Sequence, residues 1–226
     1  IAADAALVDI NLPRPVAAGY DILVEVKAVS VKPVDYEVRN STPPADGDWK
    51  VLGWDAAGIV REVGPDVTQF ELGDEVYYAG SITRPGTNAE FHLVDARIVG
   101  HKPASLSWAE AAALPLTTLT AWEAMFDRLD VAKPVPGAAE AILIIGGAGG
   151  VGSIAVQIAR QRTDLTVIAT ASRPETQEWV RGLGAHHVID HSRPLAPQIA
   201  ELGIGAPAFV FSTTHTEQHV ADIAEL

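Results

Sequence analysis

A glycine-rich segment in the second half of the chain has the spacing of a nucleotide-binding loop. Gly147, Gly149 and Gly152 satisfy the pattern G-x-G-x-x-G directly after the apolar run Ala141–Ile145. In this pattern a strand leads into a tight turn that opens a helix, and N–H groups at the positive end of that helix bind a pyrophosphate. The alternative is a tight turn without a ligand. The predicted cofactor-binding residues of the loop are Gly147, Gly149, Gly150, Val151 and Gly152.

The end of the next predicted strand distinguishes NADP from NAD. Proteins that bind NAD place a carboxylate about 20 residues after the loop, where it binds the ribose 2′-hydroxyl. Counting from Gly152 reaches Ser172 and Arg173, and the segment 169–174 contains no carboxylate. A guanidinium binds a 2′-phosphate in a charge-assisted pair, whereas a carboxylate would repel it. We therefore expect NADPH, with NADH as the alternative cofactor and a solvated surface charge as the alternative role of Arg173.

Charge and composition limit the possible partners. The 226 residues include 16 basic and 29 acidic side chains, a formal net charge of −13 that repels a nucleic-acid backbone. The chain has no cysteine, which excludes disulfides, thiolate metal sites and a cysteine nucleophile. Its apolar runs are much shorter than the roughly 20 residues that span a bilayer. We expect a cytoplasmic protein that binds neither nucleic acid nor membranes.

The elements that must position the glycine loop change character along the chain. Short β-rich runs separated by turn residues fill roughly the first 105 residues and predict a compact, barrel-like β domain. These predicted strands are Asp21–Val29, Ala57–Val63, Asp74–Ala79 and Glu90–Val94.

A capping-box spacing between Ser107 and Glu110 then predicts a helix that extends to about Leu114. A second helix is predicted over 117–129, and the proline-containing segment 130–137 breaks it and forms a short linker.

Strands and helices alternate beyond this break, which predicts a parallel sheet with right-handed crossovers. The predicted strands are Ala141–Ile145, Leu165–Ala171, His187–Asp190 and Ala208–Ser212. The predicted helices are Val151–Gln161, Glu175–Gly182, Leu195–Leu202 and Thr216–Leu226.

Short motifs in a characteristic order cover nearly the whole chain. They are Val31–Asp35, Leu52–Val60, Glu62–Gly64, Gly73–Tyr77, Ala111–Pro115, Thr120–Trp122 and Gly146–Gly152. Together they resemble the medium-chain dehydrogenase/reductase superfamily, especially its quinone oxidoreductase-like and zinc-type alcohol dehydrogenase-like branches. The resemblance implies an α/β chain with a GroES-like β-barrel catalytic domain in residues 1–115 and an NADP(H)-binding Rossmann domain in residues 116–226.

The same resemblance implies that the active site lies in a cleft between the two domains. It also implies that the family's first strand and last two Rossmann strands are missing, so that the strand 208–212 is an unpaired edge. Relatives often form homodimers through such edge strands, and we expect a homodimer for the full-length protein.

The resemblance also bears on zinc. Members with catalytic zinc use Cys, His and Cys, and these positions fall on Lys32, Trp54 and near Leu116. None of these side chains is a good zinc ligand, so we expect no metal site. His215 and His219, four residues apart, and the group His186, His187 and His191 are interpreted as surface or strand-end residues, with metal binding as the alternative.

Two further interpretations concern single histidines. His191 follows the third Rossmann strand, where related NADPH enzymes place an aromatic residue near the adenosine 2′-phosphate, so we assign it to the cofactor site. His92 and His101 are interpreted as structural.

Without a metal, the chemistry that remains is hydride transfer to an acceptor that stabilises its own charge. A quinone or an α,β-unsaturated carbonyl does so, and the protein must then hold acceptor and nicotinamide together and donate hydrogen bonds to the developing oxyanion. The predicted catalytic residues are Lys32, Tyr36 and Thr120, acting on a small hydrophobic electrophile. Two alternatives stay open, namely a zinc-type alcohol dehydrogenase and a catalytically silent NADPH-binding protein.

Several neighbouring residues depart from the family pattern. Lys32 stands where related quinone reductases carry Asn, and its alternative role is that of a solvated loop lysine. Asp35 is expected to cap the following helical turn. Glu37 replaces a frequent tyrosine, with Tyr36 beside it. Trp54 is expected to form an apolar pocket wall, with ordinary core packing as the alternative.

Overall fold

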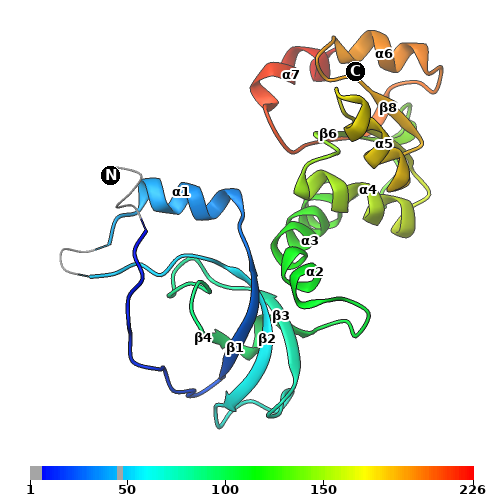
Figure 1. Cartoon of the computed structure of the whole chain (residues 1–226). Coiled ribbons are helices and arrows are strands. Elements are labelled where there is room, and N and C mark those ends of the chain that lie inside the picture. The colour runs from blue at the N-terminus through cyan, green and yellow to red at the C-terminus, as the bar shows by residue number, and fades with distance from the viewer. Residues whose placement is uncertain (1–6, 45–47) are drawn as a thin grey trace. The chain divides into compact units, whose positions relative to one another are not determined.

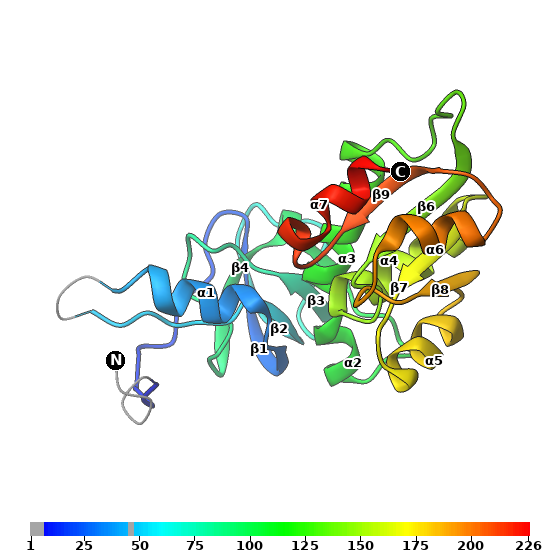
Figure 2. The ribbon, with the colours of Figure 1, turned by 90° about the horizontal axis from the view of Figure 1, so that it is seen from above.

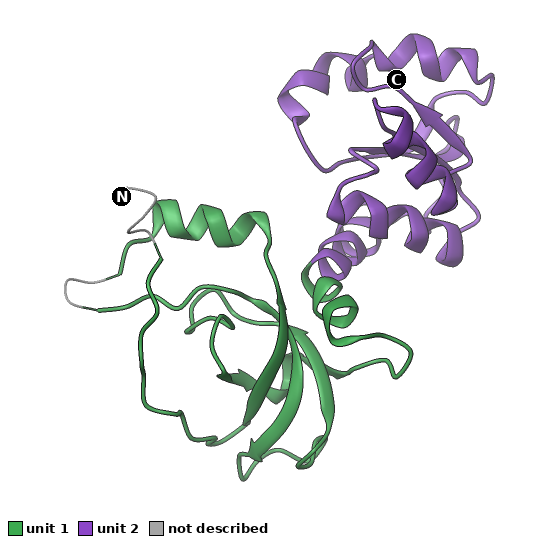
Figure 3. Ribbon diagram, in the orientation of Figure 1, with its two compact units in different colours: residues 1–116 green, residues 117–226 purple. Residues whose placement is uncertain are grey.

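The chain folds into two compact units, each with a sheet of its own. The computed structural model describes residues 7–44 and 48–226, and contacts divide the chain into unit 1, residues 1–116, and unit 2, residues 117–226 (Figure 3). The division falls one residue beyond the predicted domain boundary. In the ranges described, no helix is long and apolar enough to cross a membrane.

Unit 1 is built on an antiparallel five-stranded sheet with the strand order β4-β1-β2-β3-β5 (Figure 1). Its strands are β1 (Asp21–Ser30), β2 (Asp55–Val63), β3 (Glu75–Ala79), β4 (Phe91–Asp95) and β5 (Val99–His101). The first four confirm the predicted β runs. Strand β5 was not predicted, because three residues are too few to show an alternating pattern.

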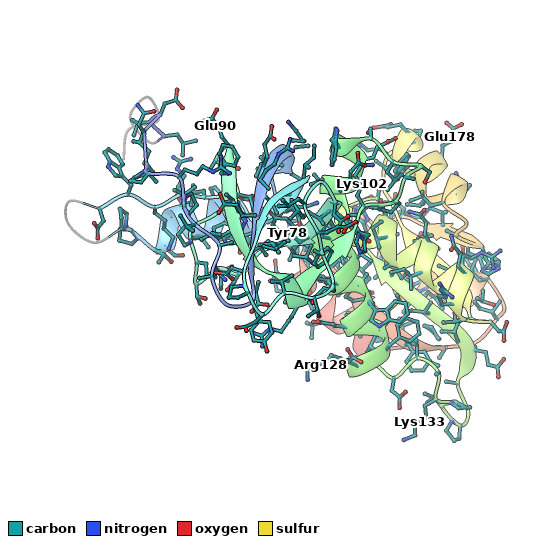
Figure 4. All side chains as sticks on the ribbon, turned by 90° about the horizontal axis from the view of Figure 1, so that it is seen from below. Tyr78, Glu90, Lys102, Arg128, Lys133 and Glu178 are labelled. Atoms are coloured by element: carbon teal, nitrogen blue, oxygen red, sulfur yellow. The ribbon has the colours of Figure 1, made fainter. Side chains whose placement is uncertain are left out.

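The interior of unit 1 contains one buried polar network. Tyr78 of β3 lies among the packed side chains, whereas Glu90 projects at the surface (Figure 4). The Tyr78 hydroxyl is 3.0 Å from Nδ1 of His92, and Nε2 of His92 is 3.0 Å from the Pro85 carbonyl oxygen. Burial raises the pKa of Tyr78 and lowers the pKa of His92, so both are neutral at pH 7. Nε2–H therefore donates to Pro85, and the structural role predicted for His92 is confirmed.

Among the described residues, two α-helices lie wholly within unit 1, of which α2 (Trp108–Ala113) packs against the sheet. Helix α2 begins with the predicted capping box, because the Glu110 N–H donates to Ser107 Oγ at 3.3 Å and the Ser107 N–H donates to Glu110 Oε2 at 2.8 Å. Helix α1 (Pro33–Ser41) is longer than the single helical turn predicted after Asp35. Its start carries two helix signals, Pro33 in the first turn and Asp35 accepting from the Lys32 N–H at 2.8 Å. A short 3-10 turn, η2 (Ala96–Ile98), joins β4 to β5.

Unit 2 is built on a parallel sheet with the strand order β8-β7-β6-β9 (Figure 2). Its strands are β6 (Ala139–Ile145), β7 (Thr166–Thr170), β8 (His187–Ile189) and β9 (Pro207–Ser212). The helices that alternate with them are α4 (Gly150–Arg162), α5 (Pro174–Gly182), α6 (Leu195–Glu201) and α7 (Thr216–Ala224). All eight predicted elements are present. Within the described residues β9 pairs on one side only, as the edge prediction requires.

Strand β6 is wholly apolar over 141–145 because both of its faces are covered. Ile142 and Ile144 belong to a buried cluster that includes residues of α4 and α5. Leu143 and Ile145 point to a second cluster with residues of α6. The strand that leads into the glycine loop is therefore packed on both faces.

The helix predicted over 117–129 changes its winding partway. It begins as α3 (Pro115–Trp122) and continues as a π-helix, η3 (Glu123–Arg128), in which the Leu129 N–H donates to the Ala124 carbonyl. Asp130, with φ +51°, then ends it. The predicted short linker, residues 130–137, lies between η3 and β6 inside unit 2.

The close approach of β6 and α4 makes Gly152 sensitive to substitution. A Cβ at Gly152 would lie 2.2 Å from the Gly146 carbonyl oxygen and 2.8 Å from the Gly147 Cα, both backbone atoms. We expect Gly152→Ala to lower the free energy of unfolding by at least about 2 kcal/mol, measured by urea denaturation. Gly182→Ala is the matched control, because nothing lies within 4 Å of its Cβ position. An equal effect of both substitutions would contradict the steric explanation.

Candidate functional site

The glycine loop connects β6 to α4 in a turn that is closed by its own backbone. Gly146 has φ +80°, the Gly149 N–H donates to the Gly146 carbonyl at 3.0 Å, and the Gly147 N–H donates to the Thr170 carbonyl at 3.1 Å. Gly149 is the N-cap of α4 and provides no side-chain cap. The first N–H groups of a helix have no intrahelical acceptors. The start of this 13-residue helix therefore offers donors to an anion such as a pyrophosphate.

Glycine is required at several loop positions by close contacts. A Cβ at Gly147 would lie 2.8 Å from the Ala169 Cβ, and one at Gly146 would lie 2.6 Å from Thr213 Oγ1. A Cβ at Gly150 would be 3.3 Å from Thr117 Cγ2. Gly146 lies outside the predicted cofactor-binding residues, and its positive φ makes the first part of the turn possible. The residues present fit a dinucleotide on this turn.

Thr170, at the end of β7, links the loop to His191. Its Oγ1 accepts from the Gly146 N–H at 2.9 Å and lies 3.0 Å from Nδ1 of His191. Burial is the main cause that lowers the pKa of His191, so its ring is neutral at pH 7. The Thr170 side chain therefore connects His191 to the glycine loop. Thr170 was missed because a threonine at a strand end carries no motif of its own.

The residues predicted to bind the 2′-phosphate follow the same strand. Ser172 is half-buried, and Arg173 is the exposed N-cap of α5. Nε of Arg173 lies 2.8 Å from Oε1 of Glu175, in a pair whose side chains are 70 % and 69 % exposed. The carboxylate of Glu175 lies just beyond the segment searched in the sequence. Because such an exposed ion pair contributes little to stability, Arg173 can exchange its contact with Glu175 for one with a phosphate.

Lys32, in unit 1, is held in place by charge. Its Nζ donates to the Ala113 carbonyl at 2.7 Å and lies 3.3 Å from Oδ2 of Asp55. The Lys32 side chain is only 11 % exposed, so the alternative of a solvated lysine is wrong. Lys32 is also the N-cap of α1, where the helix dipole disfavours a cation. Its position therefore depends on the nearby acidic groups.

Two carboxylates contact Lys32, Asp55 at its ammonium and Asp35 at its backbone N–H. Asp55 begins β2 with a side chain that is 0 % exposed, and its Oδ1 accepts from the Leu116 N–H at 2.9 Å. Burial raises the pKa of Asp55 to about 6, Lys32 opposes the rise, and Asp35 adds to it. Asp35 caps α1 through Oδ2, as predicted. Among the described residues, Asp35 Oδ1 and Asp55 Oδ2 are buried without a hydrogen-bond partner. Asp55 Oδ2 instead faces the Lys32 ammonium in an ion pair.

The other predicted catalytic residues lie on two different helices. Tyr36 is on α1 and is 64 % exposed. Thr120 is exposed on α3 within unit 2, whereas Lys32 and Tyr36 belong to unit 1. Lys32, at the N-cap of α1, and Tyr36 thus belong to the same helix. Asp55 was not selected from the sequence, although its place directly after Trp54 was a usable signal.

The residues at the family's zinc positions do not fit zinc. Nζ of Lys32 is committed to Ala113 and Asp55, and Trp54 is 2 % exposed with its indole N–H donating to the Ser81 carbonyl at 3.0 Å. An indole offers no lone pair to a metal, and Leu116 has no donor atom in its side chain. Over 7–44 and 48–226 no group of three His, Cys, Asp or Glu residues could hold a metal ion. The burial of Trp54 favours core packing over a pocket wall.

The remaining histidines make local contacts. Nδ1 of His186 accepts from the Val167 N–H at 2.8 Å. His215 precedes α7 with φ +47°, and its Nδ1 lies 2.7 Å from Thr214 Oγ1, while His219 is buried on α7. His215 therefore does not share a helix face with His219. The exposed His186 and His215 agree with the interpretation as strand-end and surface residues, whereas the buried His219 does not.

Comparisons with known families match both halves of the chain. Residues 18–122 match the alcohol dehydrogenase GroES-like domain, and residues 150–226 match the zinc-binding dehydrogenase family. The matches confirm the predicted fold class, a GroES-like domain followed by a Rossmann-like domain.

Individual relatives agree with these matches. A zinc-type alcohol dehydrogenase-like protein of Staphylococcus aureus is 44 % identical over 94 % of this chain, which spans 63 % of that relative's length. The crystal structure of a candidate zinc-dependent alcohol dehydrogenase protein from Rhizobium etli is 79 % identical with a TM-score of 0.97, covering 100 % of this chain and 66 % of that one. The Escherichia coli quinone oxidoreductase complexed with NADPH is 28 % identical with a TM-score of 0.71, covering 86 % of this chain and 57 % of that one.

The raised pKa of Asp55 predicts a specific pH dependence of stability. The ordinary carboxyl titrates near 3.8 and Asp55 near 6, so between these values the folded state binds more protons and loses stability as pH rises. We expect the unfolding free energy of the wild type, relative to Asp55→Asn, to fall by about 2–3 kcal/mol between pH 4 and 7.

Denaturant unfolding across this pH range measures the difference. Asp95→Asn is the control, because Arg97 lowers the pKa of Asp95 to about 2 and its ionisation is complete by pH 4. A flat difference for Asp55→Asn would show that Asp55 is not desolvated as described.

Proposed function

Because the chain belongs to the medium-chain dehydrogenase/reductase superfamily, we propose that the protein is an NADPH-dependent oxidoreductase that reduces a quinone or an α,β-unsaturated carbonyl without catalytic zinc. The observation that carries this proposal is the Lys32 ammonium, fixed 3.3 Å from Asp55 at a position where zinc-containing relatives have a ligand. It provides a cation and a proton donor, but no lone pair for a metal.

The cofactor is assigned to unit 2, with the adenosine end near β7. Gly147, Gly149, Gly150, Val151 and Gly152 would hold the pyrophosphate through the closed turn and the start of α4. Ser172, Arg173 and His191 would hold the 2′-phosphate. When bound, NADPH supplies the hydride. The relative from Escherichia coli that was crystallised with NADPH supports this choice of cofactor.

The protein's own contribution to the reduction is charge stabilisation and one proton. An acceptor that takes a hydride gains negative charge on its carbonyl oxygen, which a nearby ammonium stabilises. Lys32 Nζ then gives a proton to the reduced acceptor and recovers one from solvent. Tyr36 and Thr120 are proposed as further hydrogen-bond donors to the acceptor or the nicotinamide ribose.

Two other functions make different predictions. A zinc alcohol dehydrogenase would contain stoichiometric zinc in elemental analysis of the purified protein. A silent NADPH-binding protein would bind NADPH but consume none with a quinone, an enal and an alcohol. The oxidoreductase proposed here consumes NADPH with the quinone or the enal and contains no stoichiometric zinc.

Replacing Arg173 tests the cofactor assignment. We expect Arg173→Glu to weaken NADPH binding by about 10- to 100-fold, because a charge-assisted pair with the phosphate is lost and a like charge is added. NADH binding should change by less than about twofold, since NADH carries no 2′-phosphate. Isothermal titration calorimetry with both nucleotides measures the two effects. Arg181→Glu, at the other end of α5, is the control, and equal losses for NADPH and NADH would refute the assignment.

Replacing Lys32 tests the catalytic assignment. We expect Lys32→Met to lower kcat for a quinone or an enal by about 100-fold, because the proton donor is lost, with NADPH binding unchanged. Stopped-flow measurement of NADPH oxidation provides kcat. Lys27→Met is the matched control, since Lys27 pairs with Glu25 at the surface of β1. A variant at position 32 that retains wild-type kcat would remove Lys32 from the mechanism.

A further inference from the structure

The Lys32 ammonium is oriented by a carboxylate that the sequence analysis did not select. We propose that Asp55 is the positioning residue of Lys32: its buried carboxylate holds the ammonium at the N-terminus of α1 and determines where Lys32 can deliver its proton. This inference rests on the proposed function, because it names the group on which the proposed proton donor depends.

The geometry of unit 1 gives Asp55 this role. Its Oδ1 is fixed by the Leu116 N–H at 2.9 Å, which leaves Oδ2 directed at Lys32 Nζ at 3.3 Å. The Ala113 carbonyl accepts from the same Nζ at 2.7 Å. The ammonium is thus held between α2 and β2, while its backbone N–H is held by Asp35. Every contact of this set comes from a different element, so the position of Nζ is defined by the fold.

Charge and burial indicate why the carboxylate matters. The Asp55 side chain is 0 % exposed, and an ionised carboxylate in such a place is costly without a cation beside it. The titratable groups that act on it are Lys32, which favours the ionised form, and Asp35, which disfavours it. A carboxylate kept ionised at this cost is typical of functional sites.

The state of Asp55 can be observed directly through Lys32. The chain has only five lysines, at positions 27, 32, 50, 102 and 133, so the side-chain carbons of ¹³C-lysine-labelled protein are resolvable by NMR. The Lys32→Met spectrum identifies the Lys32 signal. We expect this signal to shift with a midpoint near pH 6 in the wild type, when Asp55 takes up a proton, and to show no such step in Asp55→Asn.

Activity provides the second readout. The kcat of the wild-type protein should fall by about tenfold from pH 7 to pH 5, because protonated Asp55 no longer holds the ammonium. In Asp55→Asn, kcat should be low at pH 7 and independent of pH over this range, while Asp55→Glu should restore part of the acid limb. Asp21→Asn is the matched control, since its carboxylate pairs with Arg84 elsewhere in unit 1 and its loss should leave the acid limb intact.

The two readouts separate this inference from the proposed function. A Lys32 signal without a step near pH 6 in the wild type, or with the same step in Asp55→Asn, would overturn the role of Asp55. An acid limb that persists in Asp55→Asn would overturn it as well. A normal NMR step in an intact protein that reduces no quinone or enal would refute the proposed function and leave the coupling of Asp55 and Lys32 in place.

Discussion

The ion pair between Lys32 and Asp55 is the contact on which the candidate catalytic site depends. A carboxylate with no exposed surface needs a cation, and a cation at a helix N-terminus needs a carboxylate. Each group therefore makes the other possible. The pair forms only when β2, α1 and the start of α3 pack together, because Asp55 also accepts a hydrogen bond from the Leu116 N–H. The site is a consequence of how unit 1 packs.

The glycine loop of unit 2 depends on close packing more than on charge. Gly146 and Gly147 bring the chain against Thr213 and Ala169, at distances that exclude a side chain. The apolar strand β6, covered on both faces, holds the first half of this turn rigid. A bound phosphate would then meet N–H groups that are already oriented. Binding would then cost little conformational entropy, because the loop is ordered beforehand.

The side chains at the positions that the resemblance assigns to zinc connect these two observations to the proposed chemistry. The matched families carry zinc and dehydrogenase in their descriptions, yet this chain places an ammonium and an indole N–H where ligands would be needed. Both groups are hydrogen-bond donors, and neither offers a lone pair to a metal. What the chain places here is a positive charge held by Ala113 and Asp55, and under the proposed function that charge would stabilise an acceptor whose oxygen becomes negative.

The sequence by itself determined the order of elements and the nucleotide loop, because both are local. Apolar alternation, the Ser107 capping box and G-x-G-x-x-G depend on residues close together in the chain, and the structure contains the predicted elements. The helix α1 escaped prediction because it is short and Val34 and Val38 are its only helically spaced aliphatic pair, while only Pro33 and Asp35 signal its start.

Tertiary structure alone decided the partners of Lys32, the burial of Trp54 and the link from Thr170 to His191. Lys32 and Ala113 are 81 residues apart, and Thr170 and His191 are 21 apart. No periodic pattern records such pairs, since long-range contacts follow from how strands and helices are packed. Desolvation, which makes Asp55 chemically unusual, likewise arises only when the surrounding chain has excluded water.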